Sequence, residues 1–186
     1  AQASWRGLAA TGEQVLVDAH GGWHDPWRGL SEVVVAEPAG LLVAVADRLA
    51  IRAGSDWASA WAAADAAAAA AVTATLDAAP DLTGAAVAHE VLAAVPAGAE
   101  LVVGASLPIR DVDLAPSARP DVRILANRGA AGIDGTVATT LGVAVASEVP
   151  AWSLLGDHTL LHDANGLLLQ PGSPVPSCTL VVVDNG

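Results

Sequence analysis

The stretch Ala-Trp-Ser-Leu-Leu-Gly-Asp, residues 151–157, decides the fold, and Thr-Leu-Val-Val-Val-Asp-Asn-Gly, residues 179–186, has the same plan. In each, a short apolar run ends in polar residues beside a glycine. Such continuously apolar runs are typical of strands covered on both faces of a parallel sheet. Ligands bind at the carboxyl ends of these strands. The two stretches therefore predict two strand ends that carry Asp157 and Asn185.

Asp157 and Asn185 supply a carboxylate oxygen and an amide oxygen. Magnesium prefers near-octahedral oxygen coordination and combines a few protein ligands with phosphate oxygens and water. The pair therefore predicts a divalent-cation site. A plain helix cap at Asp157 is the alternative. His158 and His162 share one face of the next predicted helix and permit a two-histidine metal site, although no HExxH pattern surrounds them.

The alternation of strands and helices extends outward through the chain and predicts an α/β fold with parallel sheets flanked by helices. Asp56 is expected to cap a long helix. A break at residues 80–84 divides the chain into two regions, 1–79 and 80–186. Strands are expected over 15–18, 33–36, 100–103, 122–125, 152–155 and 179–183, and helices over 41–51, 56–78, 84–95, 136–147 and 157–169, with a helical turn near 108–114.

Composition excludes several classes of protein. The net charge of −12, with only eight basic residues, argues against a broad nucleic-acid-binding surface. The Ala-rich run 58–72 is weakly apolar and contains Asp65, so no transmembrane helix is expected. No signal peptide is expected either, because no charged segment followed by an apolar leader is seen. A single cysteine, Cys178, fits a reducing cytoplasm.

Two further features point to anion binding. Arg110 and Arg128 follow predicted strand ends, and a guanidinium is the preferred partner of a carboxylate, although an ordinary surface ion pair is the alternative. The Gly-rich segment 127–136 precedes a helix, where backbone amides can approach an anion. A tight turn is the alternative there, with Asp134 as a helix cap. The Thr159 hydroxyl is expected to bind a phosphate oxygen or to cap a helix. Ser106 lacks the nucleophile-elbow context of a hydrolase, so a catalytic triad is not expected there.

Four blocks in this order resemble a known family. They read Gly-Ala-Ser-Leu-Pro-Ile-Arg at 104–110, Asn-Arg-Gly-Ala-Ala-Gly-Ile-Asp-Gly at 127–135, Gly-Asp-His-Thr at 156–159 and Val-Asp-Asn-Gly at 183–186. Together they resemble the 2-succinyl-5-enolpyruvyl-6-hydroxy-3-cyclohexene-1-carboxylate synthases, the thiamine-diphosphate enzymes of menaquinone biosynthesis. The second block separates this family from acetolactate synthase and pyruvate decarboxylase. The loop ending at residues 25–28 also looks like the family's central domain.

The resemblance implies a thiamine-diphosphate-binding fold in two pieces. Residues 1–79 correspond to the C-terminal part of the central domain with its connecting helix. Residues 80–186 correspond to the N-terminal half of the diphosphate- and magnesium-binding domain. The pyrimidine-binding domain, which carries the glutamate that activates the cofactor, is absent. No catalytic residue is therefore expected within these 186 residues, and the chain alone is expected to be inactive.

The resemblance also implies a transferase reaction. The full enzyme decarboxylates 2-oxoglutarate on thiamine diphosphate, with Mg²⁺ or Mn²⁺, and adds the succinyl unit to isochorismate. A cytoplasmic homodimer or homotetramer that binds no nucleic acid is expected. Metal ligands are Asp157 and Asn185; cofactor contacts are Gly132, Ile133, Gly156, Asp157, Thr159 and Asn185; substrate contacts are Ser106, Arg110 and Arg128.

The chain departs from the family pattern at two positions. Gly186 follows Asn185 directly where another Asn or Asp is usual, and His158 stands where an apolar residue is usual. Two alternatives stay open. One is another thiamine-diphosphate lyase of the acetolactate synthase type. The other is a non-catalytic fragment that contributes only an interface.

Overall fold

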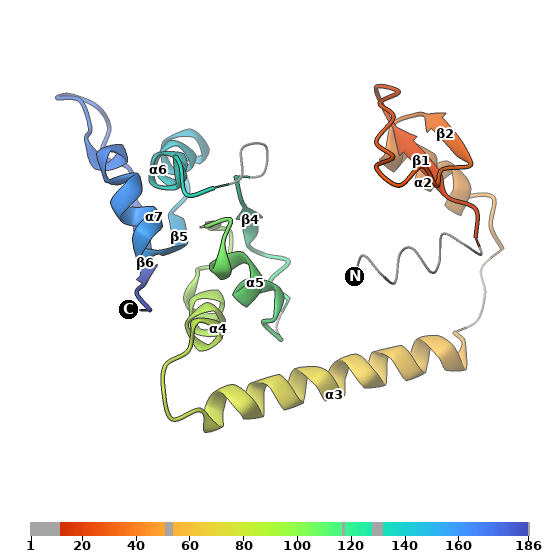
Figure 1. The fold of residues 1–186 in the computed structure, drawn as a ribbon, viewed down its shortest axis with the longest axis horizontal. Helices are drawn as coiled ribbons and strands as arrows, with labels where there is room; N and C mark the ends of the chain where they lie inside the picture. Colours follow the sequence, from red (N-terminus) through yellow and green to blue (C-terminus); the bar gives the residue numbers. More distant parts are fainter. Residues whose placement is uncertain (1–11, 51–53, 117, 128–131, 186) are drawn as a thin grey trace. The chain divides into compact units, whose positions relative to one another are not determined.

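The computed structural model describes residues 12–50, 54–116, 118–127 and 132–185 (Figure 1). The chain forms two units, Ala1–Gly54 and Ser55–Gly186, each with its own internal contacts. The expected boundary lies at residues 79/80, after the long helix, whereas the helix groups with the second unit. The assignment of 1–79 and 80–186 to domains of a larger enzyme stays a prediction.

The first unit pairs two short parallel strands, β1 (Val15–Asp18) and β2 (Glu32–Val35), and continues into α2 (Pro38–Ala46). Helix α2 begins three residues before the predicted start, because proline is well suited to a first helical turn. The loop between the strands is held by the carboxylates of Asp18 and Asp25, which accept bonds from backbone amides. Asp18 accepts bonds from the amides of His20 and Gly22, and these bonds lower its pKa.

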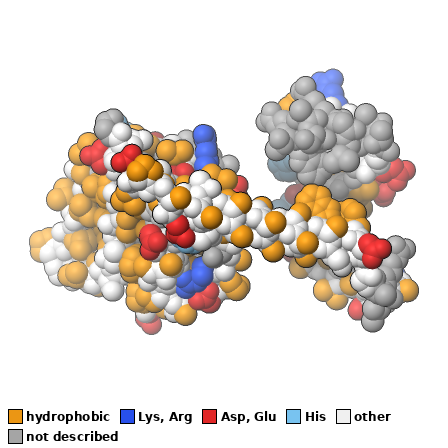
Figure 2. All heavy atoms as spheres, turned by 90° about the horizontal axis from the view of Figure 1, so that it is seen from below, with side chains coloured by type: hydrophobic (Ala, Val, Ile, Leu, Met, Phe, Trp, Pro, Cys, Tyr) orange, Lys and Arg blue, Asp and Glu red, His pale blue; other side chains and the backbone are white. Residues whose placement is uncertain are grey.

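The second unit begins with α3 (Asp56–Ala78), whose bounds match the prediction. Its cap is Ser55 rather than Asp56, because the serine hydroxyl oxygen accepts a bond from the Ala58 amide at 3.2 Å. Trp57 and Trp61 contact each other, with ring centroids 5.9 Å apart, yet they are 72% and 62% exposed. Figure 2, seen from the α3 side, shows hydrophobic side chains exposed along this helix. Within the described part of the chain, these two rings therefore contact each other and stay largely exposed.

A four-stranded parallel sheet forms the centre of the second unit. Its strands lie in the order β4-β3-β5-β6, so β3 and β5 are inner strands. All four residues of β3 are buried, the apolar residues 101–103 as expected for an inner strand and Glu100 beside its ion-pair partner Arg123. The strands are β3 (Glu100–Val103), β4 (Arg123–Leu125), β5 (Ala151–Gly156) and β6 (Cys178–Val183).

Helices cover both faces of this sheet. On one face, α4 (Gly84–Ala94) and α5 (Leu107–Asp113) pack against Leu101, Val103 and Leu154. On the other, α6 (Thr136–Ser147) packs against Leu155. The predicted α/β fold with parallel sheets flanked by helices is confirmed. Among the described residues, no helix combines the length and hydropathy needed to cross a bilayer.

The helix after β5 is shorter than predicted. Helix α7 ends at His162 and is followed by a 3₁₀ turn, η1 (Ala164–Leu167), instead of continuing to residue 169. A tertiary contact accompanies this early end. The Asp163 carboxylate accepts a hydrogen bond from the Ala138 amide of α6 at 2.9 Å. Gly166 lies against the same amide, so the turn packs closely on α6.

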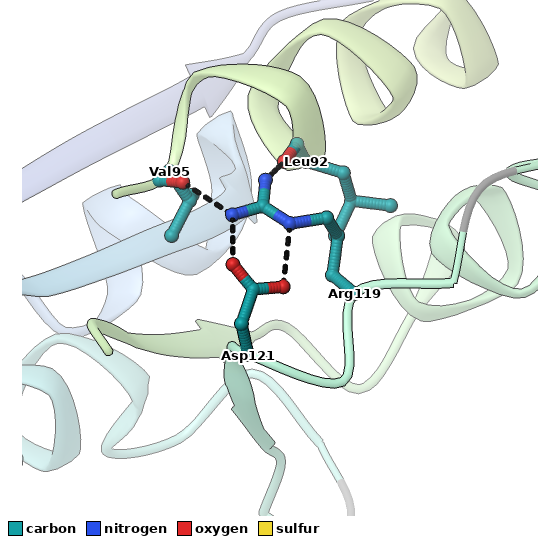
Figure 3. Close-up of polar contacts among 4 residues, drawn as sticks. All are labelled: Leu92, Val95, Arg119 and Asp121. Atoms are coloured by element: carbon teal, nitrogen blue, oxygen red, sulfur yellow. Dashed lines mark hydrogen bonds and ion pairs between the residues drawn. The ribbon is translucent and has the colours of Figure 1, made fainter. Parts of the chain in front are cut away.

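An arginine clamp closes the end of α4 (Figure 3). The Arg119 guanidinium donates to the carbonyl oxygens of Leu92 and Val95, the latter at 2.9 Å. It also forms a two-bond pair with Asp121. Because the last carbonyls of a helix lack partners within the helix, the clamp fixes the end of α4 to the segment that leads into β4.

Candidate functional site

A cavity of about 270 Å³ opens at the carboxyl ends of β5 and β6. Helices α5 and α7 supply its other walls. The strand-end prediction accounts for much of the lining, because six of the nine predicted site residues contribute. These six are Ser106, Ile133, Gly156, Asp157, Thr159 and Asn185.

Strand pairing explains why Asp157 and Asn185 meet in this cavity. Strands β5 and β6 are parallel neighbours, and Gly156 lies opposite Val183 in the register. Asp157 follows the first of these residues directly and Asn185 follows the second closely, so both leave the sheet at the same edge. The carboxylate and the amide therefore line one cavity although they are far apart in the sequence.

Helix α7 begins beside the cavity. Its N-cap is Gly156, which provides no side-chain capping bond, and Asp157 is the first helical residue. The alternative in which Asp157 only caps the helix is therefore wrong, and so is a capping role for Thr159. Thr159 is buried and also lines the cavity. The Asp157 side chain is 27% exposed, and its Oδ2 lies 3.1 Å from Nδ1 of His158.

The Gly-rich segment is placed only in part. Residues 128–131 lie outside the described residues, whereas Ile133 lines the cavity and Gly132 precedes it. Gly135 caps α6 with a φ of 66°, a left-handed conformation that suits glycine, so the expected cap at Asp134 is wrong. The Ala138 amide already bonds to Asp163, and it is therefore not free to bind an external anion.

The two histidines of α7 do not converge on one site. His158 contacts Asp157, whereas His162 lies 3.7 Å from Asp134. Among the described residues, no group of three or more His, Cys, Asp or Glu side chains is arranged to hold a metal ion. The two-histidine alternative therefore has no geometric support.

The predicted substrate contacts are placed unevenly. Ser106 lines the cavity at the start of α5, and its hydroxyl makes no capping bond. Arg110 is exposed on α5 and is absent from the described residues that line the cavity. Arg128 lies outside the described residues. The three substrate contacts remain a prediction.

Sequence reasoning missed one polar group, Asp111. This residue lines the cavity beside Ser106, and burial raises the pKa of its carboxyl group. A Cβ atom on Gly84 would lie 2.7 Å from Asp111 Oδ2, so the carboxylate packs against the start of α4. Only the packing of α5 on α4 brings Asp111 here, and no sequence pattern signals that packing. Also missed were the apolar residues Leu107, Pro108 and Val183, whereas His158, which the sequence suggested only as part of a two-histidine metal site, lines the cavity as well.

The chemistry of the lining fits a magnesium–diphosphate group. Asp157 and Asn185 offer oxygen ligands of the kind that Mg²⁺ prefers. The hydroxyl-bearing residues Ser106 and Thr159 lie around the same cavity and are suited to phosphate oxygens. Among the described residues of the lining there is no Cys or Met side chain, and His158 supplies the one imidazole.

Comparison with known proteins finds relatives that carry one name, although no family model matches the chain. The chain is 44% identical over 178 residues to the 2-succinyl-5-enolpyruvyl-6-hydroxy-3-cyclohexene-1-carboxylate synthase of Saccharopolyspora erythraea, covering 96% of this chain and 31% of that protein. It is 41% identical over 187 residues to the synthase of the same name from Sorangium cellulosum, covering 95% of this chain and 30% of that protein.

A third relative matches a shorter part of the chain. The Thermobifida fusca synthase of the same name is 50% identical over 103 residues, which are 53% of this chain and 19% of that protein. The chain thus spans under one third of the length of the curated relatives it matches. The predicted resemblance is confirmed, for a segment of those proteins.

Proposed function

We propose that this chain, a homologue of one segment of the 2-succinyl-5-enolpyruvyl-6-hydroxy-3-cyclohexene-1-carboxylate synthases, forms the diphosphate- and Mg²⁺-binding part of such an enzyme. The complete enzyme is a transferase of menaquinone biosynthesis that acts on 2-oxoglutarate and isochorismate. The relatives compared above all carry this one name, which favours it over the acetolactate synthase type.

The observation that carries the proposal is the cavity shared by Asp157 and Asn185 at adjacent strand ends. These two residues hold Mg²⁺ or Mn²⁺, which neutralises the diphosphate charge. Gly132, Ile133, Gly156 and Thr159 contact the rest of that group. Bound thiamine diphosphate supplies the carbanion-stabilising chemistry, and the protein positions the substrate and polarises it.

Substrate charge explains the remaining roles. Both substrates are polyanionic, and Ser106, Arg110 and Arg128 bind their carboxylates. The glutamate that activates the cofactor lies outside these 186 residues, so this chain by itself carries no complete active site. We place the enzyme in the cytoplasm as a homodimer or homotetramer that binds no nucleic acid.

Calorimetric titration of thiamine diphosphate, with and without Mg²⁺, tests the proposal in the complete polypeptide that contains this chain. Asp157→Ala should abolish the Mg²⁺-dependent part of cofactor binding, because a charged oxygen ligand is lost. Asp113→Ala is the matched control, since it removes an exposed carboxylate of α5 that does not line the cavity. Unchanged cofactor affinity in Asp157→Ala would refute the proposed metal site.

A further inference from the structure

Asn127 lies half-buried at the junction between strand β4 and helix α6, and it is not among the described residues that line the cavity. Its side-chain amide donates a hydrogen bond from Nδ2 to the carbonyl oxygen of Asp134 at 3.5 Å. The Thr139 hydroxyl lies 3.3 Å from both Nδ2 and Oδ1 of this amide, so it can accept a bond from the first atom and donate a bond to the second. The amide therefore links the end of β4 to two points around the start of α6.

Helix α6 is a firm anchor for this contact. Val137 and Leu141 are buried against the sheet, and Thr139 lies between them on the same helix. Asn127 follows β4 by two residues, and β4 pairs with the inner strand β3. The amide and the hydroxyl thus meet between elements whose positions are set by the core. From this fixed point, the amide holds the carbonyl of Asp134.

The carbonyl of Asp134 adjoins the cavity wall. Ile133, the residue before Asp134, lines the cavity. Gly135, the residue after it, has a φ of 66° and begins α6 without a side-chain capping bond. Because glycine adopts many backbone conformations, the peptide between Asp134 and Gly135 has more freedom to rotate unless its carbonyl is held. The bond from Asn127 supplies this restraint one residue away from the wall.

We propose that Asn127 is a positioning residue that holds Ile133 in the cavity wall, so that the wall is already ordered when thiamine diphosphate binds. This inference rests on the function proposed above, in which Ile133 contacts the cofactor. The free-energy cost of ordering the backbone of one residue corresponds to about 5- to 30-fold in affinity. Without the amide of Asn127, this cost falls on the binding step and weakens the affinity by that factor.

The measurement is the affinity of thiamine diphosphate at saturating Mg²⁺ for the complete polypeptide that contains this chain, by calorimetry. Asn127→Ala should bind the cofactor about 5- to 30-fold more weakly than the parent. Its binding should still require Mg²⁺, because Asp157 and Asn185 are unchanged. Asn165→Ala is the matched control, since it truncates an exposed asparagine of η1 that is not among the described residues of the lining. The control should keep the parent affinity.

Two substitutions at Thr139 test the same contact from its other side, and they keep the proposal falsifiable if Asn127→Ala folds poorly. Thr139→Val preserves the shape of the side chain and removes the hydroxyl, so it should also weaken cofactor binding. Thr139→Ser keeps the hydroxyl and should bind the cofactor like the parent. Equal affinities in the two variants, whether both parent-like or both weak, would overturn the proposal, because the hydroxyl that orients the amide would then be irrelevant.

A double-mutant cycle with Ile133→Ala separates positioning from general support of the fold. If Asn127 acts through Ile133, Asn127→Ala should change the affinity by less than about 2-fold once Ile133 is replaced by alanine. The same loss in both backgrounds would overturn the positioning role, as would parent-like affinity of the single Asn127→Ala variant. Unchanged affinity in Asp157→Ala would refute the proposed metal site, while the cycle would still report on Asn127. A parent protein that does not bind thiamine diphosphate would overturn both proposals.

Discussion

Removal of the Asp163 carboxylate should loosen the junction between α6 and α7 by a predictable amount. Asp163 Oδ2 accepts a 2.9 Å bond from the Ala138 amide, the third residue of α6, where Gly135 provides no cap of its own. Loss of an N-terminal cap costs about 0.5–2 kcal/mol, typically about 1 kcal/mol. The negative charge beside the helix N-terminus contributes about 0.3–1 kcal/mol of that value.

Asp163→Ala should therefore lower the free energy of unfolding by about 1 kcal/mol. Asp163→Asn keeps an oxygen acceptor and loses only the charge, so its loss should be about half as large. Urea unfolding followed by circular dichroism measures both, and the slope with denaturant should stay constant. Asp113→Ala, a change at an exposed position, should fall within about 0.5 kcal/mol of the parent. Equal midpoints for the parent and Asp163→Ala would refute the capping role.

Three other substitutions test the core and the charged groups. Leu154→Ala, at a position 1% exposed on an inner strand, should cost about 2–5 kcal/mol in the same unfolding assay. Burial raises the pKa of the Asp111 carboxyl group, so ionisation of this group destabilises the folded state at pH values above the ordinary pKa of Asp. Asp111→Asn should therefore raise the melting temperature at pH 7, and this gain should vanish by about pH 3. The bonds from Arg119 lower the pKa of Asp121, so this pair stabilises the fold at neutral pH and loses that effect as the pH falls through the lowered pKa. Arg119→Ala should therefore lower the melting temperature more at pH 7 than in acid.

Local signals in the sequence predicted many elements with correct bounds. The apolar run 100–103 and the helices 56–78 and 136–147 are found as predicted, because their ends are marked by Gly, Pro, Ser or Asp nearby. The convergence of Asp157 and Asn185 was also predictable in outline. The carboxyl ends of parallel strands lie at one edge of a sheet, and the sequence marks those ends.

Long-range contacts explain the errors. Nothing near Asp163 in the sequence shows that its carboxylate bonds to an amide of another helix, so the early end of α7 was missed. Asp111 enters the cavity only because α5 packs beside α4. Local propensity also favoured Asp134 as a cap, whereas the backbone places Gly135 there in a left-handed conformation. Each of these features depends on tertiary packing.

The tryptophan pair on α3 has a spectroscopic consequence. The chain contains no Tyr and no Phe, so its near-ultraviolet signals arise from indole rings. Trp57 and Trp61 lie 5.9 Å apart at an interplanar angle of 60°, a geometry in which their electronic transitions couple and give a paired circular-dichroism band. Half-buried Trp152 lies on strand β5 of the sheet and packs against the core. Unwinding of α3 would separate the two rings and erase the paired band, so circular dichroism can report on this helix in particular.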